Sequence, residues 1–397
     1  MKDVAAVLLN YNSGALCVSA VESLLDQRFS AEDGGPGSLQ LLVVDNASPE
    51  DQHEHLDPLT ELGVELVYHG RNDGYSGGMN LGMSLVDARY VLIANPDVLV
   101  LPEALERMLA LLRSDASVGM VGPRGFLDPG RFLLLPPNDL PTLSLHIQSS
   151  LGRVYQKIAR RVAHDRSRRF LKGWLAEGPF EIDMISGFGM FLPTDLARKL
   201  GPFDEQYPFY FEDADLCRRL RRMGRRILIE PRAHMVHYYD QSARSVRAEV
   251  SRKYEVSQAY YYRKHYGRMG SWLFRRFGEY AAARAGRAEG WGFSKFDDLG
   301  EADRPVCVEL PAKRDFVLEI TSDPAFLFCG GHCATGLEIT IGRSAWAMLD
   351  RGRWFARLLD RNDLTLIRAV TFEKTTPADG PTSWADLRAE AAAEGSS

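Results

Sequence analysis

The sequence VAAVLLNYNSG at residues 4–14 contains a short apolar run followed directly by a polar turn, which is typical of a buried strand that ends in a loop. After the turn, Leu16, Ala20 and Leu24 recur at helical spacing. A second apolar run follows at residues 39–44. Because short apolar strands alternate with helices, we expect an α/β fold with a doubly wound, mostly parallel sheet and helices on both faces.

Polar residues follow each predicted strand, at the edge where sheets of this class bind ligands. The first strand is followed by Asn10, Tyr11 and Asn12, the second by Asp45 and Asn46, and the third (residues 64–68) by the run RNDGYSGGMN at 71–80. Glycines before a helix let a ligand approach the backbone, and a helix N-terminus attracts phosphate. The run matches neither the dinucleotide fingerprint nor the P-loop, so the sequence supports neither of those sites.

The fourth predicted strand, residues 90–94, ends in the sequence NPDV at 95–98. A carboxylate at a strand end beside a phosphate-binding turn suits Mg²⁺ or Mn²⁺, which take oxygen ligands and borrow others from a substrate diphosphate. Asx-Pro sequences also open turns. Taken alone, the motif favours a turn role for Asp97.

The stretch FDEQYPFYFEDADLCRRLRRMGRR at residues 203–226 places three carboxylates between an aromatic run and a predicted helix. The helix dipole favours acidic side chains at such a position, which explains one or two of Glu212, Asp213 and Asp215. The aromatic run at 207–211 would hold the carboxylates in a partly dry site, where a carboxylate can act as a base. A helix start and a catalytic site are both compatible with this stretch.

Six separated pieces of the chain, taken in order, resemble the family 2 glycosyltransferases of the GT-A fold, and within them the bacterial rhamnosyltransferase-like branch. The pieces lie within about residues 3–266 and read NYN, VVDNAS, RNDGYSGGMNLG, NPDV, FDEQYPFYFEDADLCRRLRRMG and HYYDQS. The resemblance implies an inverting enzyme that transfers a sugar from a nucleoside-diphosphate donor to a hydroxyl of a glycan or lipid-linked acceptor. dTDP-rhamnose is the first donor to expect, followed by UDP-hexose or galactofuranose donors.

The resemblance also implies roles for individual residues. Tyr11 or Asn12 and Asp45 would contact the nucleobase and ribose of the nucleotide-sugar, and Asn72 and Gly78 would line its pocket. Asp97 and His237 would lie at the metal and the diphosphate. Asp213 would be the catalytic base, and Glu212 would orient either this base or the acceptor. For His237 a hydrogen-bonded loop histidine is an equal alternative. Asp215 is expected to start the helix and to pair with Arg219.

Asn95 stands where the first aspartate of the family's D-x-D metal motif is usual, which leaves one carboxylate for the Mg²⁺ or Mn²⁺ ion. This departure motivates a second hypothesis, a carbohydrate-binding or scaffolding protein on a catalytically weak core. A nucleotidyltransferase is a third, but the Gly-rich N-terminal loop with Arg or Lys that it needs is absent.

Two basic stretches lie outside these motifs. Residues 151–176 carry eight basic residues against one acidic, and Leu151, Val154, Tyr155, Ile158 and Val162 share a helical face. This pattern fits a membrane surface or an anionic lipid-linked acceptor, with a solvated surface helix as an equal alternative. Residues 244–276 carry nine basic residues against two acidic, interleaved with aromatic residues, and the family context favours a membrane-facing helix pair over nucleic acid.

The chain is expected to divide into four parts. We assign residues 1–241 to the GT-A core, 242–301 to a helical basic and aromatic extension, 302–376 to a small β-rich domain, and 377–397 to a tail with a frayed helix and a disordered end. Strand-like runs lie at 316–320, 326–329, 337–341 and 364–370. The β-rich domain would bind the acceptor or mediate homo-oligomer formation.

The composition is that of a globular protein, and its 397 residues are enough for two domains. The net charge of -5 gives no reason to expect a nucleic-acid partner. No leader and no membrane-spanning apolar run are seen, so we expect a cytoplasmic protein, peripheral at the inner face of the cell membrane if it acts on lipid-linked acceptors. The cluster CGGHC at 329–333 lacks a second ligand pair and is interpreted as two buried thiols on a strand.

Overall fold

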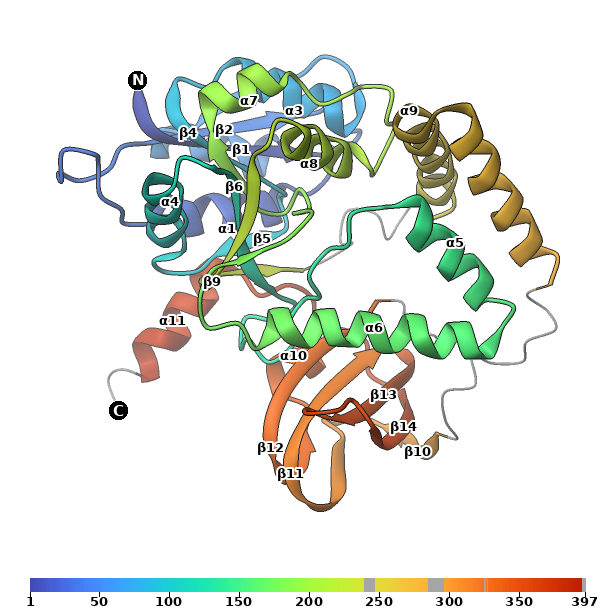
Figure 1. The fold of residues 1–397 in the computed structure, drawn as a ribbon. Coiled ribbons are helices and arrows are strands. Elements are labelled where there is room, and N and C mark those ends of the chain that lie inside the picture. Colours follow the sequence, from blue (N-terminus) through green and yellow to red (C-terminus); the bar gives the residue numbers. More distant parts are fainter. Residues whose placement is uncertain (239–246, 285–295, 325, 327, 395–397) are drawn as a thin grey trace.

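A computed structural model describes residues 1–238, 247–284, 296–324, 326 and 328–394 (Figure 1). Among these residues the larger sheet contains β1 (Lys2–Asn10), β2 (Leu39–Asp45), β3 (Glu65–Tyr68), β4 (Ala88–Ala94), β5 (Val98–Val100), β6 (Val118–Phe126), β7 (Phe180–Glu181), β8 (Met190–Pro193) and β9 (Arg226–His237). The helices around it are α1 (Gly14–Leu25), α2 (His53–Leu56), a 3₁₀ turn (Asp57–Leu62), α3 (Gly74–Ser84), α4 (Ala104–Ser114), α7 (Thr194–Leu200) and α8 (Glu212–Arg222).

The strands of this sheet lie in the order β3-β2-β1-β4-β8-β6-β9-β5, with β7 added on β9. The first four are parallel to one another, and β6 is parallel to β9. The strands β5, β7 and β8 pair antiparallel with their neighbours. The predicted α/β core with a mostly parallel sheet is therefore confirmed.

The central strand β1 is buried on both faces, which explains its uninterrupted apolar sequence. Alternate side chains enter two different cores: Val4, Ala6 and Leu8 pack with α1 and α4 on one side. Residues 5, 7 and 9 pack with α3, α7 and α8 on the other. The helices on both faces thus leave only the ends of the strands open to a ligand.

A helical region projects from the core beside the carboxyl ends of the strands (Figure 1). It consists of α5 (Leu143–Gly152), α6 (Gln156–Trp174) and the long α9 (Arg247–Ala282), which is kinked at Gly267, where φ is +66°. The expected division of the chain at residues 242 and 301 stays a prediction.

The helical face predicted for residues 151–176 is interrupted, because α5 ends at Gly152 and α6 begins at Gln156. Tyr155 therefore lies outside α6, whereas Phe170 and Trp174 lie inside it and are buried. They pack against Val317 and Leu359 of the second sheet. The helix therefore joins the two sheets, and its aromatic end is not available to a membrane.

The second sheet lies below α6 in Figure 1 and contains five strands among the described residues. These are β10 (Asp297–Ala302), β11 (Cys307–Thr321), β12 (Gly330–Thr340), β13 (Gly352–Asp360) and β14 (Leu366–Lys374), and a short helix, α10 (Arg343–Met348), precedes β13. They run in the order β10-β14-β13-β11-β12. The C-terminal β-rich region is confirmed, although residues 328–329 lie outside any strand and β13 was not predicted.

The strand β13 escaped prediction because charged residues interrupt its apolar run. Its Arg357 is buried, and the guanidinium Nε donates to Glu319 Oε2 of β11 at 2.7 Å. This pair crosses the centre of the sheet, where an apolar residue would be expected. Cys329 and Cys333 of the CGGHC sequence are free thiols, buried and half-buried respectively, with Cys333 on β12.

The chain ends in a helix that returns to the core, α11 (Trp384–Glu394). Trp384 is buried, and its indole Nε1 donates to Asp26 Oδ2 at 2.7 Å beside α1. The expected helix is present, and one aromatic anchor fixes its start; that it frays stays a prediction. The last three residues lie outside the described part of the chain. Within that part, none of the helices combines the length and apolar character needed to cross a bilayer.

Candidate active site

A hydrogen-bonded polar cluster lies where β1 and β2 end side by side. The side chain of Asn10 donates to Asp45 Oδ1 at 2.7 Å, and the Ser48 hydroxyl donates to the same oxygen at 2.6 Å. Asp45 is only 5% exposed, so these bonds fix its carboxylate in one orientation. The neighbouring Tyr11 is 39% exposed, and Asn12 adopts a left-handed conformation with φ of +52°. The three predicted nucleotide contacts therefore share one edge of the sheet.

The turn into α3 differs from the sequence-based prediction. The helix begins at Gly74, so Gly77 and Gly78 lie within its first turns rather than before it. A Cβ on Gly78 would lie 2.5 Å from Leu9 Cδ1, so this glycine is required for close packing of α3 on β1. The side chain of Asn46 donates to Asn72 Oδ1 at 3.1 Å and so ties the turn to the end of β2.

The two residues expected at the metal lie together, although they are far apart in the sequence. His237 Nε2 lies 3.3 Å from Asp97 Oδ1, and the two side chains belong to neighbouring segments at the pairing of β5 with β9. Both residues are buried. The amide of Asn95 lies 3.4 Å from His237 Nε2, and the ring of Phe188 stacks on the imidazole with a centroid distance of 5.2 Å.

This group fits a divalent cation that takes part of its coordination from elsewhere. Among the described residues there is no group of three His, Cys, Asp or Glu side chains that could hold a metal. One carboxylate and one imidazole, with an amide beside them, supply too few ligands for an octahedral ion. A substrate diphosphate and water would have to complete the coordination.

The helix α8 starts from a strained turn. Tyr210 and Phe211 have φ of +65° and +71°, the left-handed region that side chains with a Cβ rarely adopt. Each such residue costs on the order of 1–3 kcal/mol, and such strain is concentrated at functional sites. The turn delivers Glu212 and Asp213 to the interior immediately afterwards.

Asp213 has the properties of a base near neutral pH. Burial raises its pKa to about 6, opposed by hydrogen bonds from the backbone N–H groups of Ala214 and Gly187. The Ala214 bond is 2.7 Å long. Burial and the neighbouring charge of Asp213 hold the pKa of Glu212 well above its usual range. Two adjacent carboxyl groups thus share a poorly solvated site, which favours a state in which the pair of Glu212 and Asp213 holds a proton.

Asp215 has the opposite environment, although it lies only two residues beyond Asp213 on α8. Its carboxylate accepts hydrogen bonds from Arg219 Nε at 2.8 Å and His265 Nε2 at 2.8 Å, and Lys264 Nζ lies 2.7 Å away. Burial alone would raise the pKa of Asp215, but the His265 and Lys264 hydrogen bonds hold it well below its usual range. The expected structural role of Asp215, paired with Arg219, agrees with these contacts.

The metal residues and the carboxyl pair meet at two residues that the sequence reasoning missed, Gly187 and Tyr75. A Cβ on Gly187 would lie 2.7 Å from Tyr75 Oη and 3.6 Å from Asn95 Oδ1. The N–H of the same glycine favours the charged form of Asp213. A signal was present in the sequence SGFG at 186–189, whose two glycines permit close backbone approach.

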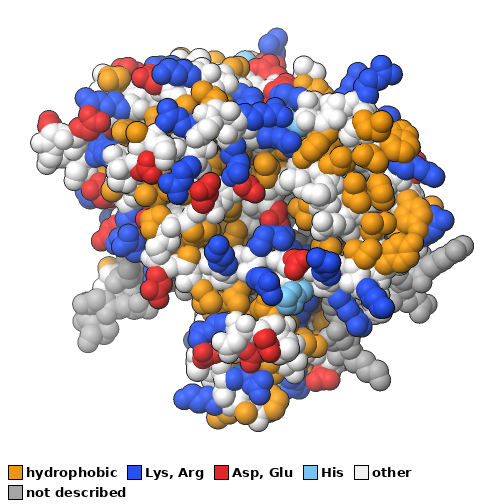
Figure 2. Space-filling model, in the orientation of Figure 1, with side chains coloured by type: hydrophobic (Ala, Val, Ile, Leu, Met, Phe, Trp, Pro, Cys, Tyr) orange, Lys and Arg blue, Asp and Glu red, His pale blue; other side chains and the backbone are white. Residues whose placement is uncertain are grey.

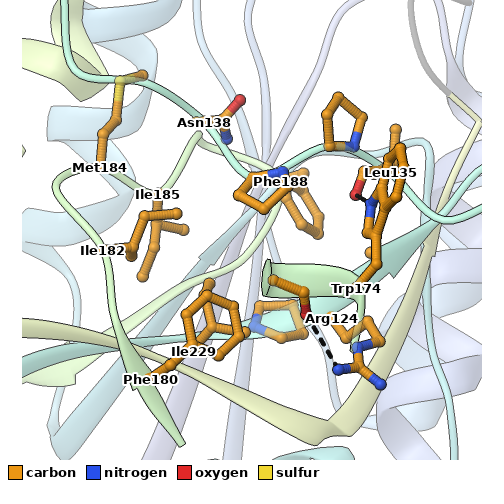
Figure 3. Close-up of a pocket in the computed structure, with 15 residues that line it drawn as sticks. Arg124, Leu135, Asn138, Trp174, Phe180, Ile182, Met184, Ile185, Phe188 and Ile229 are labelled. Atoms are coloured by element: carbon orange, nitrogen blue, oxygen red, sulfur yellow. Dashed lines mark hydrogen bonds between the residues drawn. The ribbon is translucent and has the colours of Figure 1, made fainter. Parts of the chain in front are cut away.

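An apolar pocket borders the site on the side of α6 (Figure 3). Trp174, Ile185 and Phe188 contribute to its wall, and Phe188 also stacks on His237. The guanidinium of Arg124 lies at its edge and donates to the backbone carbonyl of Gly173 at 3.2 Å. The Asp97–His237 pair is therefore bounded on one side by apolar side chains.

Comparisons with known proteins match part of the chain to one family. Residues 6–167 match the family described as glycosyl transferase family 2. The chain is 24% identical over 226 residues to the low-salt glycan biosynthesis hexosyltransferase Agl10 of Haloferax volcanii, covering 56% of this chain and 62% of that protein. It is 26% identical over 189 residues to an N-acetylglucosaminyl-diphospho-decaprenol L-rhamnosyltransferase of Mycobacterium tuberculosis, covering 44% and 59%. The chain thus spans less than two thirds of either relative.

Among solved structures, the mannosyltransferase PcManGT of Pyrobaculum calidifontis, in complex with GDP-Man and Mn²⁺, aligns with a TM-score of 0.43 and 16% identity. The alignment covers 73% of this chain and 78% of that one. The predicted family resemblance is confirmed by the match of residues 6–167.

Proposed function

Because this match places residues 6–167 in glycosyl transferase family 2, we propose that the protein transfers a sugar from a nucleoside-diphosphate donor to a hydroxyl group of a glycan or lipid-linked acceptor. One observation carries the proposal: a half-buried acid with a pKa of about 6, Asp213, shares a site with the Asp97–His237 pair. Rhamnose from dTDP-rhamnose is the first donor to test, supported by the sequence motifs and by one relative named as an L-rhamnosyltransferase. UDP-hexose and UDP-galactofuranose come next.

Asp213 is the base of the proposed reaction. It removes the proton of the acceptor hydroxyl while that oxygen attacks the anomeric carbon. A carboxylate whose pKa is raised to about 6 is still mostly ionised at neutral pH, yet it binds a proton more readily than an ordinary aspartate. Such general base catalysis contributes on the order of a hundredfold or more. A single base opposite the leaving group gives inversion at the anomeric carbon.

Asp97, His237 and Asn95 would hold a divalent cation, Mg²⁺ or Mn²⁺. When bound, such an ion neutralises the negative charge that develops on a departing diphosphate. The imidazole ligand favours Mn²⁺ over Mg²⁺, because Mg²⁺ prefers oxygen ligands only. The first turn of α3 presents backbone N–H groups near the same edge, where they attract phosphate.

The edge formed by Tyr11, Asn12 and Asp45 would hold the nucleoside. Asp45 is fixed by its hydrogen bonds to Asn10 and Ser48 and keeps acceptor capacity for the ribose hydroxyls. The exposed ring of Tyr11 offers an apolar surface for the base.

The test is release of nucleoside diphosphate from a panel of nucleotide-sugars with Mn²⁺, first without an acceptor and then with alkyl glycosides as acceptors. The wild type should turn over at least one donor, and Asp213→Asn should reduce transfer by roughly a hundredfold or more. Asp195→Asn, at the exposed start of α7, is the matched control and should leave the rate unchanged. If no donor is turned over while glycans still bind, the protein is a carbohydrate-binding scaffold and the proposal fails.

We also propose that the second half of α9 rests on an anionic membrane surface. Met269 is 69% exposed and Trp272 is 52% exposed, and the basic residues Arg268, Arg275 and Arg276 flank them. Figure 2 shows apolar side chains gathered over the α5 and α9 region, with Lys and Arg side chains around their margin. An apolar patch with a cationic rim is complementary to a bilayer that contains anionic lipids.

Vesicle binding tests this second proposal. The protein should bind vesicles that contain phosphatidylglycerol more strongly than vesicles of phosphatidylcholine alone, and Trp272→Ser should weaken the binding severalfold. Leu337→Ser, at an equally exposed apolar residue of the second sheet, is the control and should bind as the wild type does. Equal binding by the wild type and Trp272→Ser would exclude this face.

A further inference from the structure

Two buried polar atoms in the candidate active site have no hydrogen-bond partner among the described residues, Tyr75 Oη and Glu212 Oε2. Glu212 is only 6% exposed, so water does not reach this oxygen freely. Buried polar groups in folded proteins are almost always paired, because an unpaired one loses its hydrogen bonds to water without compensation. An unpaired donor and an unpaired acceptor in one site therefore indicate a ligand group that pairs with both.

The two atoms come from different elements that meet in the candidate active site. Tyr75 is the second residue of α3, and its hydroxyl lies against Gly187, where a Cβ would be 2.7 Å away. Glu212 is the first residue of α8. Besides burial, the charges of Glu212, Asp213 and Asp97, in this order, raise the pKa of Tyr75 well above its usual range. The phenol therefore stays protonated and can donate.

The position of Tyr75 identifies which part of a donor would reach it. In a displacement with inversion, the base, the anomeric carbon and the leaving oxygen lie roughly in line. In the proposed function the base is Asp213, and the diphosphate lies at Asp97. Gly187 lies against both Tyr75 Oη and Asn95, and its N–H donates to Asp213, so the tyrosine hydroxyl borders the space between the base and the metal residues. The transferred sugar would lie in that space.

We propose that Tyr75 and Glu212 together bind one hydroxyl group of the transferred sugar and thereby help to select the donor. This inference rests on the proposed function. A sugar hydroxyl fits because it accepts a hydrogen bond from Tyr75 Oη while it donates one to Glu212 Oε2. A sugar hydroxyl fits both protonation states of Glu212, because it can donate to the carboxylate or accept from the acid, whereas a phosphate oxygen, which has no proton, can pair only with the acid.

The experiment compares two ligands by calorimetry: a nucleotide-sugar that the wild type binds and the nucleoside diphosphate from which it derives. Tyr75→Phe should weaken the nucleotide-sugar roughly tenfold, the effect of one lost hydrogen bond to a buried group, and should leave the nucleoside diphosphate unchanged. Glu212→Gln, which replaces an acceptor by a donor at one of its two positions, should show the same selective loss. Tyr280→Phe, whose hydroxyl pairs only with Tyr155 at 2.6 Å on the far helices, is the control and should bind both ligands as the wild type does.

A second ligand series sharpens the result. Deoxy analogues of the same sugar should each be tested with the wild type and with Tyr75→Phe. The wild type should lose affinity on removal of one particular hydroxyl, and Tyr75→Phe should lose little further affinity for that analogue, because the hydroxyl and the tyrosine then act as one pair. The melting temperature of Tyr75→Phe should equal or exceed that of the wild type, because the hydroxyl has no partner among the residues that the structure describes.

Three results would overturn the inference. Equal weakening of the nucleoside diphosphate and the nucleotide-sugar would show that Tyr75 shapes the fold of α3 rather than the sugar subsite. Unchanged binding of both ligands by Tyr75→Phe would show that its hydroxyl meets no ligand. If the wild type binds no nucleotide-sugar of the panel, the proposed function itself has failed, which is distinct from a selective failure of the variant.

Discussion

Replacement of Asp213 by asparagine should stabilise the protein while it removes transfer. Burial raises the pKa of Asp213 from an ordinary value of 3.8 to about 6, so the folded chain binds this proton more tightly than the unfolded chain does. The free energy of unfolding therefore falls as the pH rises from about 4 to about 6, and it stays lower above that range. Since each pKa unit corresponds to about 1.4 kcal/mol, the ionised carboxylate costs at most about 3 kcal/mol at neutral pH.

Asparagine is a neutral mimic of the protonated acid and can still accept the 2.7 Å hydrogen bond from the Ala214 N–H. The variant should therefore gain about 1–3 kcal/mol of unfolding free energy near pH 7.5 and almost nothing near pH 4. The substitution also removes the charge repulsion between Asp213 and Glu212, which together with burial raises the pKa of Glu212. Stability and activity would then change in opposite directions at one residue.

Urea unfolding, followed by tryptophan fluorescence at a series of pH values, measures this difference. Asp195→Asn is again the control, because this exposed residue should show no pH-dependent gain. The reasoning is refuted if Asp213→Asn is less stable than the wild type near neutral pH. It is also refuted if the gain is the same near pH 4, since a gain without pH dependence would not come from ionisation of the carboxylate.

Three further predictions concern the surroundings of the base. Asp215→Asn should destabilise the protein by about 3–5 kcal/mol in chemical denaturation, because it removes a fully buried carboxylate that Arg219 and Lys264 bind. The wild type should lose stability as the pH falls below about 4, through the depressed pKa of Asp215. Gly187→Ala should lower the rate of transfer at least roughly tenfold, because the added Cβ would lie 2.7 Å from Tyr75 Oη. Gly178→Ala is the control and should leave the rate unchanged, because a Cβ on Gly178 would have no heavy atom within 4 Å among the described residues. Chelation of divalent cations with EDTA should abolish nucleoside diphosphate release, and Mn²⁺ should restore it better than Mg²⁺; full activity in EDTA would exclude a metal at Asp97.

The fold of the core could be predicted because its strands carry an unmistakable pattern. In the run VAAVLL the side chains on both faces of the strand are apolar. A strand needs this pattern when helices cover both faces of its sheet. The strand β13 could not be predicted in the same way, because Arg357 interrupts it and is compensated by Glu319 from a strand that lies far away in the sequence. A pattern of nearby residues cannot reveal a charge pair between residues that are distant in the sequence.

The candidate site was predicted only where residue type and motif coincide. Asp97 and His237 come together because β5 pairs with β9. The family resemblance of the motifs implied that these two residues would be close, whereas the periodicity of the chain did not indicate it. The unpaired hydroxyl of Tyr75 could not be predicted, because the pairing of a side chain within the described residues depends on three-dimensional packing. The role of Gly78 as a packing residue likewise needs the position of Leu9.

The central claim is a single displacement on a nucleotide-sugar with Asp213 as the base, and the configuration of the first product tests it most directly. Proton NMR, recorded while the wild type consumes its donor, should show a product anomer opposite in configuration to the donor. It should also show no product when Asp213 is replaced by asparagine. A product that retains the donor's configuration, or full activity of Asp213→Asn, would contradict the account.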